Sequence, residues 1–200
     1  SPLNCSIGNT RIWSARWASP AFLLTGMPIS CVPFRNAIMD FVVKEEITAT
    51  EFLNELGFLQ GNLHRSCVPL LWNLIDSHDT PRALYQAQEN KKKLKLMAAF
   101  QLLLPGMPML YYGDEVGLTG GPDPDCRRGM LWDEGRQDRQ LHTYYKKLIS
   151  LRKEYPEVLQ HKQDGEQTDD LRGVVILDKG SVVLAFCGHS EEAELSQFSG

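Results

Sequence analysis

Residues 70–82 read L-L-W-N-L-I-D-S-H-D-T-P-R, and within this stretch an apolar run changes abruptly into a polar cluster. The run at residues 70–75 is typical of a short strand buried on both faces, as in a parallel sheet covered by helices. Pro81 cannot continue a strand ladder, so the strand should end before it. Sites of parallel α/β proteins form at the carboxyl ends of strands, so the break predicts a functional site. A polar loop with an Asx-type turn at residues 79–81 is the alternative.

The next elements along the chain predict a second parallel strand. Residues 90–104, N-K-K-K-L-K-L-M-A-A-F-Q-L-L-L, begin with charge and end almost wholly apolar, which is typical of a buried helix. Pro105 and Gly106 stop it, and residues 109–112 are expected to form the next strand. Strand, helix and strand with short joins predict the right-handed βαβ unit of a parallel sheet. The glycine and proline loop at residues 117–125 lacks the G-K-S/T of a P-loop, which argues against a phosphate cradle.

Three further helices are predicted, and packing explains each of them. Residues 32–43 carry apolar side chains at helical spacing. The sequence T-A-T-E at residues 48–51 has the form of a capping box and predicts a helix to about residue 59. Residues 137–155 form the clearest amphipathic pattern, and Pro156 ends it.

The last part of the chain has a pattern typical of a linker followed by strands. Residues 160–170 are polar and predict a linker. Residues 174–177 and 182–186 are apolar and flank D-K-G-S, which predicts a β-hairpin.

Composition places the chain among ordinary globular proteins. Of its 200 residues, 42% are hydrophobic and 23% charged, and the net charge is −4. An acidic balance gives no general attraction for nucleic acid, so a neutral ligand fits better. Five cysteines without C-x-x-C spacing indicate neither a zinc site nor a disulfide framework. Reduced thiols, with no signal peptide or long apolar run in the sequence, favour a cytoplasmic protein that does not interact with a membrane.

Two blocks of sequence resemble a known family. N-L-I-D-S-H-D-T-P-R, residues 73–82, resembles the last conserved segment of the α-amylase superfamily, glycoside hydrolase family 13, in which a His-Asp pair closes the seventh strand of a (β/α)8 barrel. Residues 106–134, G-M-P-M-L-Y-Y-G-D-E-V-G-L-T-G-G-P-D-P-D-C-R-R-G-M-L-W-D-E, resemble the eighth strand and following loop of the neopullulanase, cyclomaltodextrinase and maltogenic amylase branch. The likeness covers roughly residues 32–160.

The resemblance implies an α/β fold: the C-terminal part of a (β/α)8 TIM barrel followed by the start of an antiparallel β domain. Residues 1–158 would hold about strands 5 to 8 of the catalytic barrel. Residues 159–200 would begin a C-terminal β-sandwich that is cut short. A whole barrel needs about 250 residues, so the chain is expected to be a C-terminal fragment.

The implied function is a retaining glycoside hydrolase acting on α-1,4-glucosidic bonds of cyclodextrins, maltooligosaccharides or pullulan. By the resemblance, Asp79 is the transition-state stabiliser that accepts hydrogen bonds from sugar hydroxyls, and His78 donates to the same ring. Charge-assisted bonds of this kind could supply several kcal/mol in the transition state. A loop ion pair or turn is the alternative for His78 and Asp79.

Three more residues are implied to bind substrate. Asp123 and Arg127 resemble the pair that contacts a glucose unit further toward the non-reducing side; the alternative is a mutual salt bridge bracing the loop. Trp13 would be an aromatic platform for sugar on the leaving-group side.

The resemblance does not locate a nucleophile or a general acid and base in this chain. The nucleophile belongs to the fourth strand, which would precede Ser1, so it is expected to be absent from this chain. Arg11 stands where the acid and base should be, and an arginine cannot give up a proton usefully. Residues 1–31 are therefore either divergent or damaged, or the protein is a non-catalytic relative that serves as a carbohydrate-binding or interaction module. A transferase or isomerase of the same superfamily is a third alternative.

The resemblance requires no cofactor and no metal among these residues, although it allows a structural calcium ion elsewhere in the complete enzyme. The expected partner is an α-glucan oligosaccharide, and a homodimer is an assembly open to the complete enzyme. Neither nucleic acid nor a membrane is expected to bind.

Overall fold

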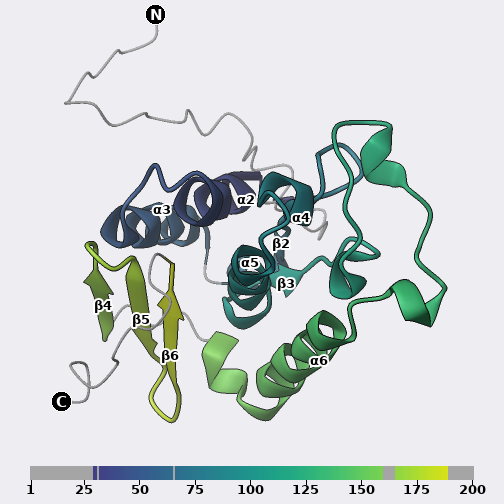
Figure 1. Ribbon diagram of the computed structural model, residues 1–200. Coiled ribbons are helices and arrows are strands. Elements are labelled where there is room, and N and C mark those ends of the chain that lie inside the picture. The colour runs from purple at the N-terminus through teal and green to yellow at the C-terminus, as the bar shows by residue number, and fades with distance from the viewer. Residues whose placement is uncertain (1–28, 31, 65, 160–164, 189–200) are drawn as a thin grey trace, which may run out of the picture.

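A computed structural model of the chain describes residues 29–30, 32–64, 66–159 and 165–188 (Figure 1). Its first sheet is parallel and has the order β1-β2-β3. The strands are β1 (Ile29–Ser30), β2 (Leu71–Asn73) and β3 (Met107–Pro108), and Trp72 in β2 lies opposite both Ser30 and Met107. Two parallel neighbours joined through a helix confirm the predicted α/β class and its βαβ unit.

The strand predicted at residues 70–75 is shorter than expected. It pairs only over Leu71–Asn73, and Trp72 is half-buried rather than enclosed on both faces. Leu74 and Ile75 remain buried beyond the end of the ladder, at 5% and 0% exposure. Their apolar character therefore reflects packing under the polar turn that follows.

The prediction of a strand at residues 109–112 is wrong. Pairing ends at Pro108, and the backbone amide of Met109 makes one more bond to the Asn73 carbonyl, 3.0 Å away. The chain then leaves the sheet because the rings of Tyr111 and Tyr112 pack on the guanidinium of Arg82.

The helices lie close to where the sequence predicts them. Three of the starts follow local capping: Thr48 and Glu51 form the expected capping box before Ala49, and the side chains of Asn90 and Asp138 accept backbone amides at the starts of the helices that begin at Lys91 and Arg139. The helices are α2 (Val32–Ile38), which continues as a π-helical segment (Met39–Val43), α3 (Ala49–Gly61), α4 (Ala83–Gln86), α5 (Lys91–Leu103) and α6 (Arg139–Glu154). Short 3-10 turns occur at Val68–Leu70, Asp114–Val116, Asp125–Arg127, Glu134–Arg136 and Pro156–Leu159.

The second sheet is antiparallel and has the order β4-β5-β6. Its strands are β4 (Glu166–Asp169), β5 (Val174–Asp178) and β6 (Val183–Cys187). β5 and β6 are the predicted hairpin, which is confirmed. The linker predicted at residues 160–170 is wrong for Glu166–Asp169, because pairing with β5 makes a strand of a polar segment that has no apolar pattern.

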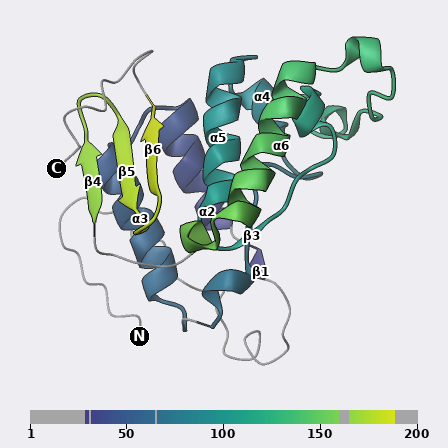
Figure 2. The same ribbon diagram turned by 90° about the horizontal axis from the view of Figure 1, so that it is seen from below.

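Helix α5 lies between β6 and α6 in both views (Figures 1 and 2). On one side the ring of Phe100 stacks on Phe186 of β6, with centroids 4.3 Å apart. On the other side the hydroxyl of Tyr144 in α6 donates to the Lys95 carbonyl in α5, over 3.1 Å. One apolar core thus joins the helices to the antiparallel sheet. In the described part of the chain, no helix is long and apolar enough to cross a membrane.

Candidate functional site

The chain makes a tight polar turn directly after β2. The amide of Ser77 donates to the Thr80 hydroxyl over 2.9 Å, and the amide of Asp79 donates to the Ser77 hydroxyl over 3.2 Å. The turn points its two middle side chains outward, and those of His78 and Asp79 are 64% and 70% exposed. A polar turn is therefore present and displays both predicted site residues, but it is closed between Ser77 and Thr80 and is not the Asx-type turn that the sequence offered at residues 79–81.

Four of the predicted site residues come together across two loops. The Nε2 of His78 lies 3.2 Å from an oxygen of Asp79. Arg127 donates from Nε to the His78 carbonyl over 3.1 Å, and its Nη2 lies 3.5 Å from Asp79 Oδ1. The same Nε lies 2.8 Å from Asp123 Oδ1, so one guanidinium contacts both aspartates. Trp13 and Arg11 lie outside the described residues.

Both alternatives raised by the sequence have a counterpart in this geometry. His78 with Asp79, and Asp123 with Arg127, each form the mutual pair that the alternative predicted. Exposed pairs of this kind stabilise a loop by at most about 1 kcal/mol. Their oxygens and N–H groups stay accessible, so the group presents acceptors and planar donors of the kind that bind sugar hydroxyls.

Hydrogen bonds and an ion pair within the loop stabilise the loop that carries Asp123 and Arg127. Asp125 accepts from the Gly121 amide over 2.7 Å, and its two oxygens lie 2.7 and 2.8 Å from Arg128. The guanidinium of Arg128, and then the Gly121 amide, lower the pKa of the Asp125 carboxyl. Cys126, which is fully buried, directs its thiol to the His78 carbonyl at 3.3 Å. These contacts hold the loop against the turn.

A buried ionic cluster lies beneath these loops, and the sequence did not single it out as a site. It consists of Asp76, Arg82 and Asp114, whose exposed fractions are 0%, 0% and 2%. Arg82 Nη1 donates to the Tyr112 carbonyl over 2.7 Å and lies 3.3 Å from Asp114 Oδ1. Burial raises the pKa of both carboxyls. The only sequence signal was position, since Asp76 directly follows the apolar run at residues 70–75 and Asp114 lies two positions after the strand predicted at residues 109–112.

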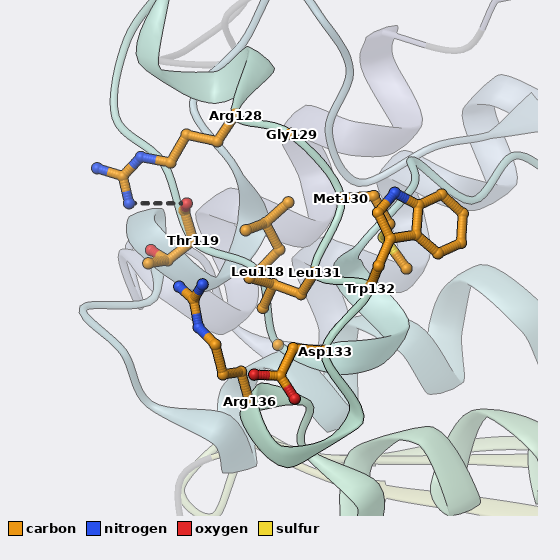
Figure 3. A pocket seen from close by; sticks show the side chains of 10 residues that line it. Leu118, Thr119, Arg128, Gly129, Met130, Leu131, Trp132, Asp133 and Arg136 are labelled. Atoms are coloured by element: carbon orange, nitrogen blue, oxygen red, sulfur yellow. Dashed lines mark hydrogen bonds between the residues drawn. The ribbon is translucent and has the colours of Figure 1, made fainter.

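A separate hollow of about 360 Å³ lies further along the same loop. Figure 3 shows Arg128 and Arg136 on one side of it, Trp132 on the other, and Leu118 and Leu131 between them. None of the four clustered site residues lines this hollow. Over the described residues, no group of three His, Cys, Asp or Glu side chains is arranged to hold a metal ion.

These features define an α/β protein with a polar site at the carboxyl ends of its parallel strands. The family model described as "Alpha amylase, catalytic domain" matches residues 34–136, which is just over half of the 200 residues. The chain therefore belongs to the alpha-amylase family.

Individual relatives indicate which branch of the family the chain resembles. It is 42% identical over 139 residues to a cyclomaltodextrinase of a Bacillus species, covering 68% of this chain and 25% of that protein. It is 44% identical over 119 residues to neopullulanase 2 of Thermoactinomyces vulgaris, covering 60% of this chain and 20% of that protein. A solved cyclomaltodextrinase structure superposes with a TM-score of 0.73 at 34% identity, covering 78% of this chain and 27% of that one. The predicted resemblance to this branch is confirmed, and the chain spans about a quarter of the length of these relatives.

Proposed function

We propose that this chain is the C-terminal part of the catalytic barrel of a retaining glycosidase acting on α-1,4-glucosidic bonds of cyclodextrins, maltooligosaccharides or pullulan. The observation that carries the proposal is the convergence of His78, Asp79, Asp123 and Arg127, which lie on two loops that follow neighbouring parallel strands. Sequence identity to cyclomaltodextrinases and a neopullulanase supports the same substrate class.

In this proposal β1, β2 and β3 are the sixth, seventh and eighth strands of the barrel. Their parallel order and the helix α5 between β2 and β3 agree with that place. The sheet β4-β5-β6 would then begin the antiparallel domain that follows the barrel.

The proposed roles of the four residues differ with their distance from the reacting bond. Asp79 accepts hydrogen bonds from hydroxyls of the sugar whose ring flattens toward an oxocarbenium ion, and His78 donates to that ring. These bonds strengthen as positive charge develops, so they lower the barrier rather than only binding substrate. Asp123 and Arg127 pin a more distant glucose unit through its hydroxyls.

The nucleophile and the acid and base are not assigned among the described residues. We propose that the complete enzyme supplies them from the strands before β1. It needs no organic cofactor, because two carboxylates suffice for a double displacement through a glycosyl intermediate.

Sequencing the encoding nucleic acid across residues 1–31 and upstream tests the proposal first. A nucleophile segment, and a glutamate codon in place of that for Arg11, are expected for the enzyme. An intact reading frame that keeps Arg11 and contains no nucleophile segment would favour a non-catalytic binding module instead.

Assay of the complete protein then separates the reaction types. We expect maltose and glucose from a cyclodextrin. Longer oligosaccharides formed without net hydrolysis would indicate a transferase.

A further inference from the structure

The hollow further along the loop after β3 combines an exposed aromatic ring with an apolar floor. Trp132 is 82% exposed, although an indole ring is mostly buried in the average folded chain. Figure 3 shows this ring on one side of the hollow, with Leu118 and Leu131 between it and two arginines. A concave, largely apolar lining with an aromatic wall is typical of small-molecule sites. Such sites measure about 300–1,000 Å³, so this hollow of about 360 Å³ fits a short segment of a ligand.

The polar groups of the hollow are planar, and they are only partly paired. The backbone amide of Arg136 donates to the Asp133 carbonyl over 3.0 Å, whereas its guanidinium makes no hydrogen bond or ion pair within the described part of the chain. Asp133 uses Oδ1 to accept from the Gly135 amide over 2.9 Å, which leaves Oδ2 as an acceptor. A planar donor beside a carboxylate acceptor can bind neighbouring hydroxyls of a sugar.

The charges at the hollow balance, because its two arginines are matched by two aspartates. Arg128 lies 2.7 and 2.8 Å from the two oxygens of Asp125. Arg136 and Asp133 both line the hollow and have opposite charges. A phosphate group is best bound by an excess of positive charge, which this lining lacks. A neutral polar ligand therefore fits better than an anion.

Hydrogen bonds fix the walls of the hollow before any ligand binds. Arg128 Nη1 donates to the Thr119 carbonyl over 3.1 Å, which joins two parts of the loop. Gln137 Nε2 donates to the Leu131 carbonyl over 2.6 Å, next to Trp132 in the chain. A site whose backbone is already held loses less conformational entropy when a ligand binds.

We propose that this hollow is a second binding site for an α-glucan, separate from the four clustered site residues. One face of a glucose ring stacks on Trp132, and its hydroxyls bond to Arg136 and Asp133. A glucose ring matches this lining because its C–H face is apolar and its edge carries hydroxyls. Arg128 of the hollow directly follows Arg127, so one loop serves both sites. The choice of an α-glucan rests on the proposed glycosidase function, whereas the preference for a neutral polyhydroxylated ligand does not.

The first experiment measures binding in the complete protein, with Asp79→Asn present so that maltoheptaose is not consumed. The fluorescence of Trp132 is the difference between this protein and the same protein with Trp132→Ala. Acrylamide should quench it, because the ring is exposed. Saturating maltoheptaose should protect it, because a stacked sugar covers the ring.

A variant of Arg136 keeps the fluorescent ring and tests the polar side of the site. Arg136→Leu removes the donors and should raise the Kd for maltoheptaose, read from the same signal, by at least about fivefold, the scale of one lost hydrogen bond. Arg139→Leu is the matched control, because Arg139 is also exposed but pairs with Glu134 over 2.7 Å and does not line the hollow. It should leave the Kd unchanged.

Two outcomes of the binding experiment would overturn the site. Shielding of Trp132 from acrylamide without sugar would show that the complete protein covers the ring itself. Protection by inorganic phosphate but not by maltoheptaose would indicate an anion site instead.

The second experiment compares substrates of two lengths in the complete enzyme with Asp79 intact. Trp132→Ala should raise KM for amylose by about tenfold, the scale of a lost aromatic anchor. KM for maltotriose, and kcat for both substrates, should stay within about twofold of the parent, since a short substrate cannot occupy both sites. Leu171→Ala, at a side chain 96% exposed outside both sites, should change neither KM. Equal changes of KM for the two substrates would overturn a second site.

The two proposals can fail separately. A complete protein that has no hydrolytic activity, but in which maltoheptaose protects Trp132, would overturn the glycosidase proposal and support the second site. An active enzyme that shows neither protection nor a KM difference between the two substrates would overturn the second site alone.

Discussion

Arg127 contacts Asp79 across 48 positions of sequence, with Nη2 3.5 Å from Oδ1, while its Nε lies 2.8 Å from Asp123. One guanidinium therefore neutralises part of the charge on both aspartates before any substrate binds. The proposed transition-state contact and the proposed distant sugar contact are not electrostatically independent, since each competes for the same donor.

The first prediction concerns Asp79. Replacing it by Asn in the complete enzyme keeps the shape but removes the charge that strengthens bonds to the sugar hydroxyls in the transition state. We expect kcat on a cyclodextrin to fall by at least about 10²-fold, the scale of losing one preorganised contact.

A matched control for Asp79→Asn is Glu134→Gln. Glu134 is also an exposed carboxylate in an ion pair, 2.7 Å from Arg139, but it lies outside the site. Its kcat should equal that of the parent. Turnover of Asp79→Asn within threefold of the parent would rule out the proposed role.

The second prediction concerns Asp123 and Arg127. Replacing Asp123 by Ala should raise KM for maltooligosaccharides by about tenfold, which corresponds to about 1.4 kcal/mol, with a smaller loss in kcat. Arg127→Ala should raise KM similarly but lower kcat more, because Arg127 also contacts Asp79 and the His78 carbonyl.

The larger loss of kcat expected for Arg127→Ala than for Asp123→Ala tests whether Arg127 also supports Asp79 and the His78 carbonyl. Steady-state kinetics at several chain lengths of substrate would measure it. Loss of folded protein with unaltered KM in the remainder would show instead that the pair only braces the loop. The ion pair between Asp125 and Arg128 offers a control, because it fastens the same loop without contacting Asp79.

The third prediction concerns the end of helix α5. Arg152 of α6 donates to the Leu102 carbonyl over 2.5 Å and to the Leu104 carbonyl over 3.2 Å, and it also contacts the Gly106 carbonyl. Arg152→Met would leave carbonyls at a helix end without a donor. We expect it to destabilise the complete enzyme by about 2 kcal/mol in denaturant unfolding, the range of charged hydrogen bonds. Lys153→Met, at an exposed neighbour, should change stability by less than about 0.5 kcal/mol.

The helices were predictable because their signals are local. Thr48 with Glu51 stabilises the start of α3, and Asn90 and Asp138 do the same for α5 and α6. A polar turn near Pro81 was likewise an alternative that the sequence offered, although the bonds that close it join Ser77 and Thr80 and lie before the expected residues 79–81.

Features that depend on distant partners were not predictable. Strand β4 has no apolar pattern and exists through its pairing with β5. The strand expected at residues 109–112 fails because Tyr111 and Tyr112 pack on Arg82, about thirty positions earlier. The cluster of Asp76, Arg82 and Asp114 was not predictable for the same reason. The sequence of neither loop indicates that the two loops pack together and bury these side chains.

The last prediction is that the 200-residue chain, expressed alone, has no glycosidase activity and associates in solution. Asp79 and His78 can only assist a displacement, and the described residues include no assigned nucleophile or proton donor, so neither half of the reaction should run.

The cause of association is the parallel sheet. Among the described strands β1 and β3 are its two edges, and Met107, Leu110 and Tyr112 near β3 expose 44%, 40% and 41% of their surface. Open edges beside exposed apolar side chains pair with other chains. We expect helical circular dichroism, because the caps of α3, α5 and α6 act locally, together with a broad thermal transition. A sharp cooperative melt from a monomer in analytical ultracentrifugation would contradict the need for further barrel strands, and release of maltose from a cyclodextrin by this chain alone would show that its own residues complete the reaction.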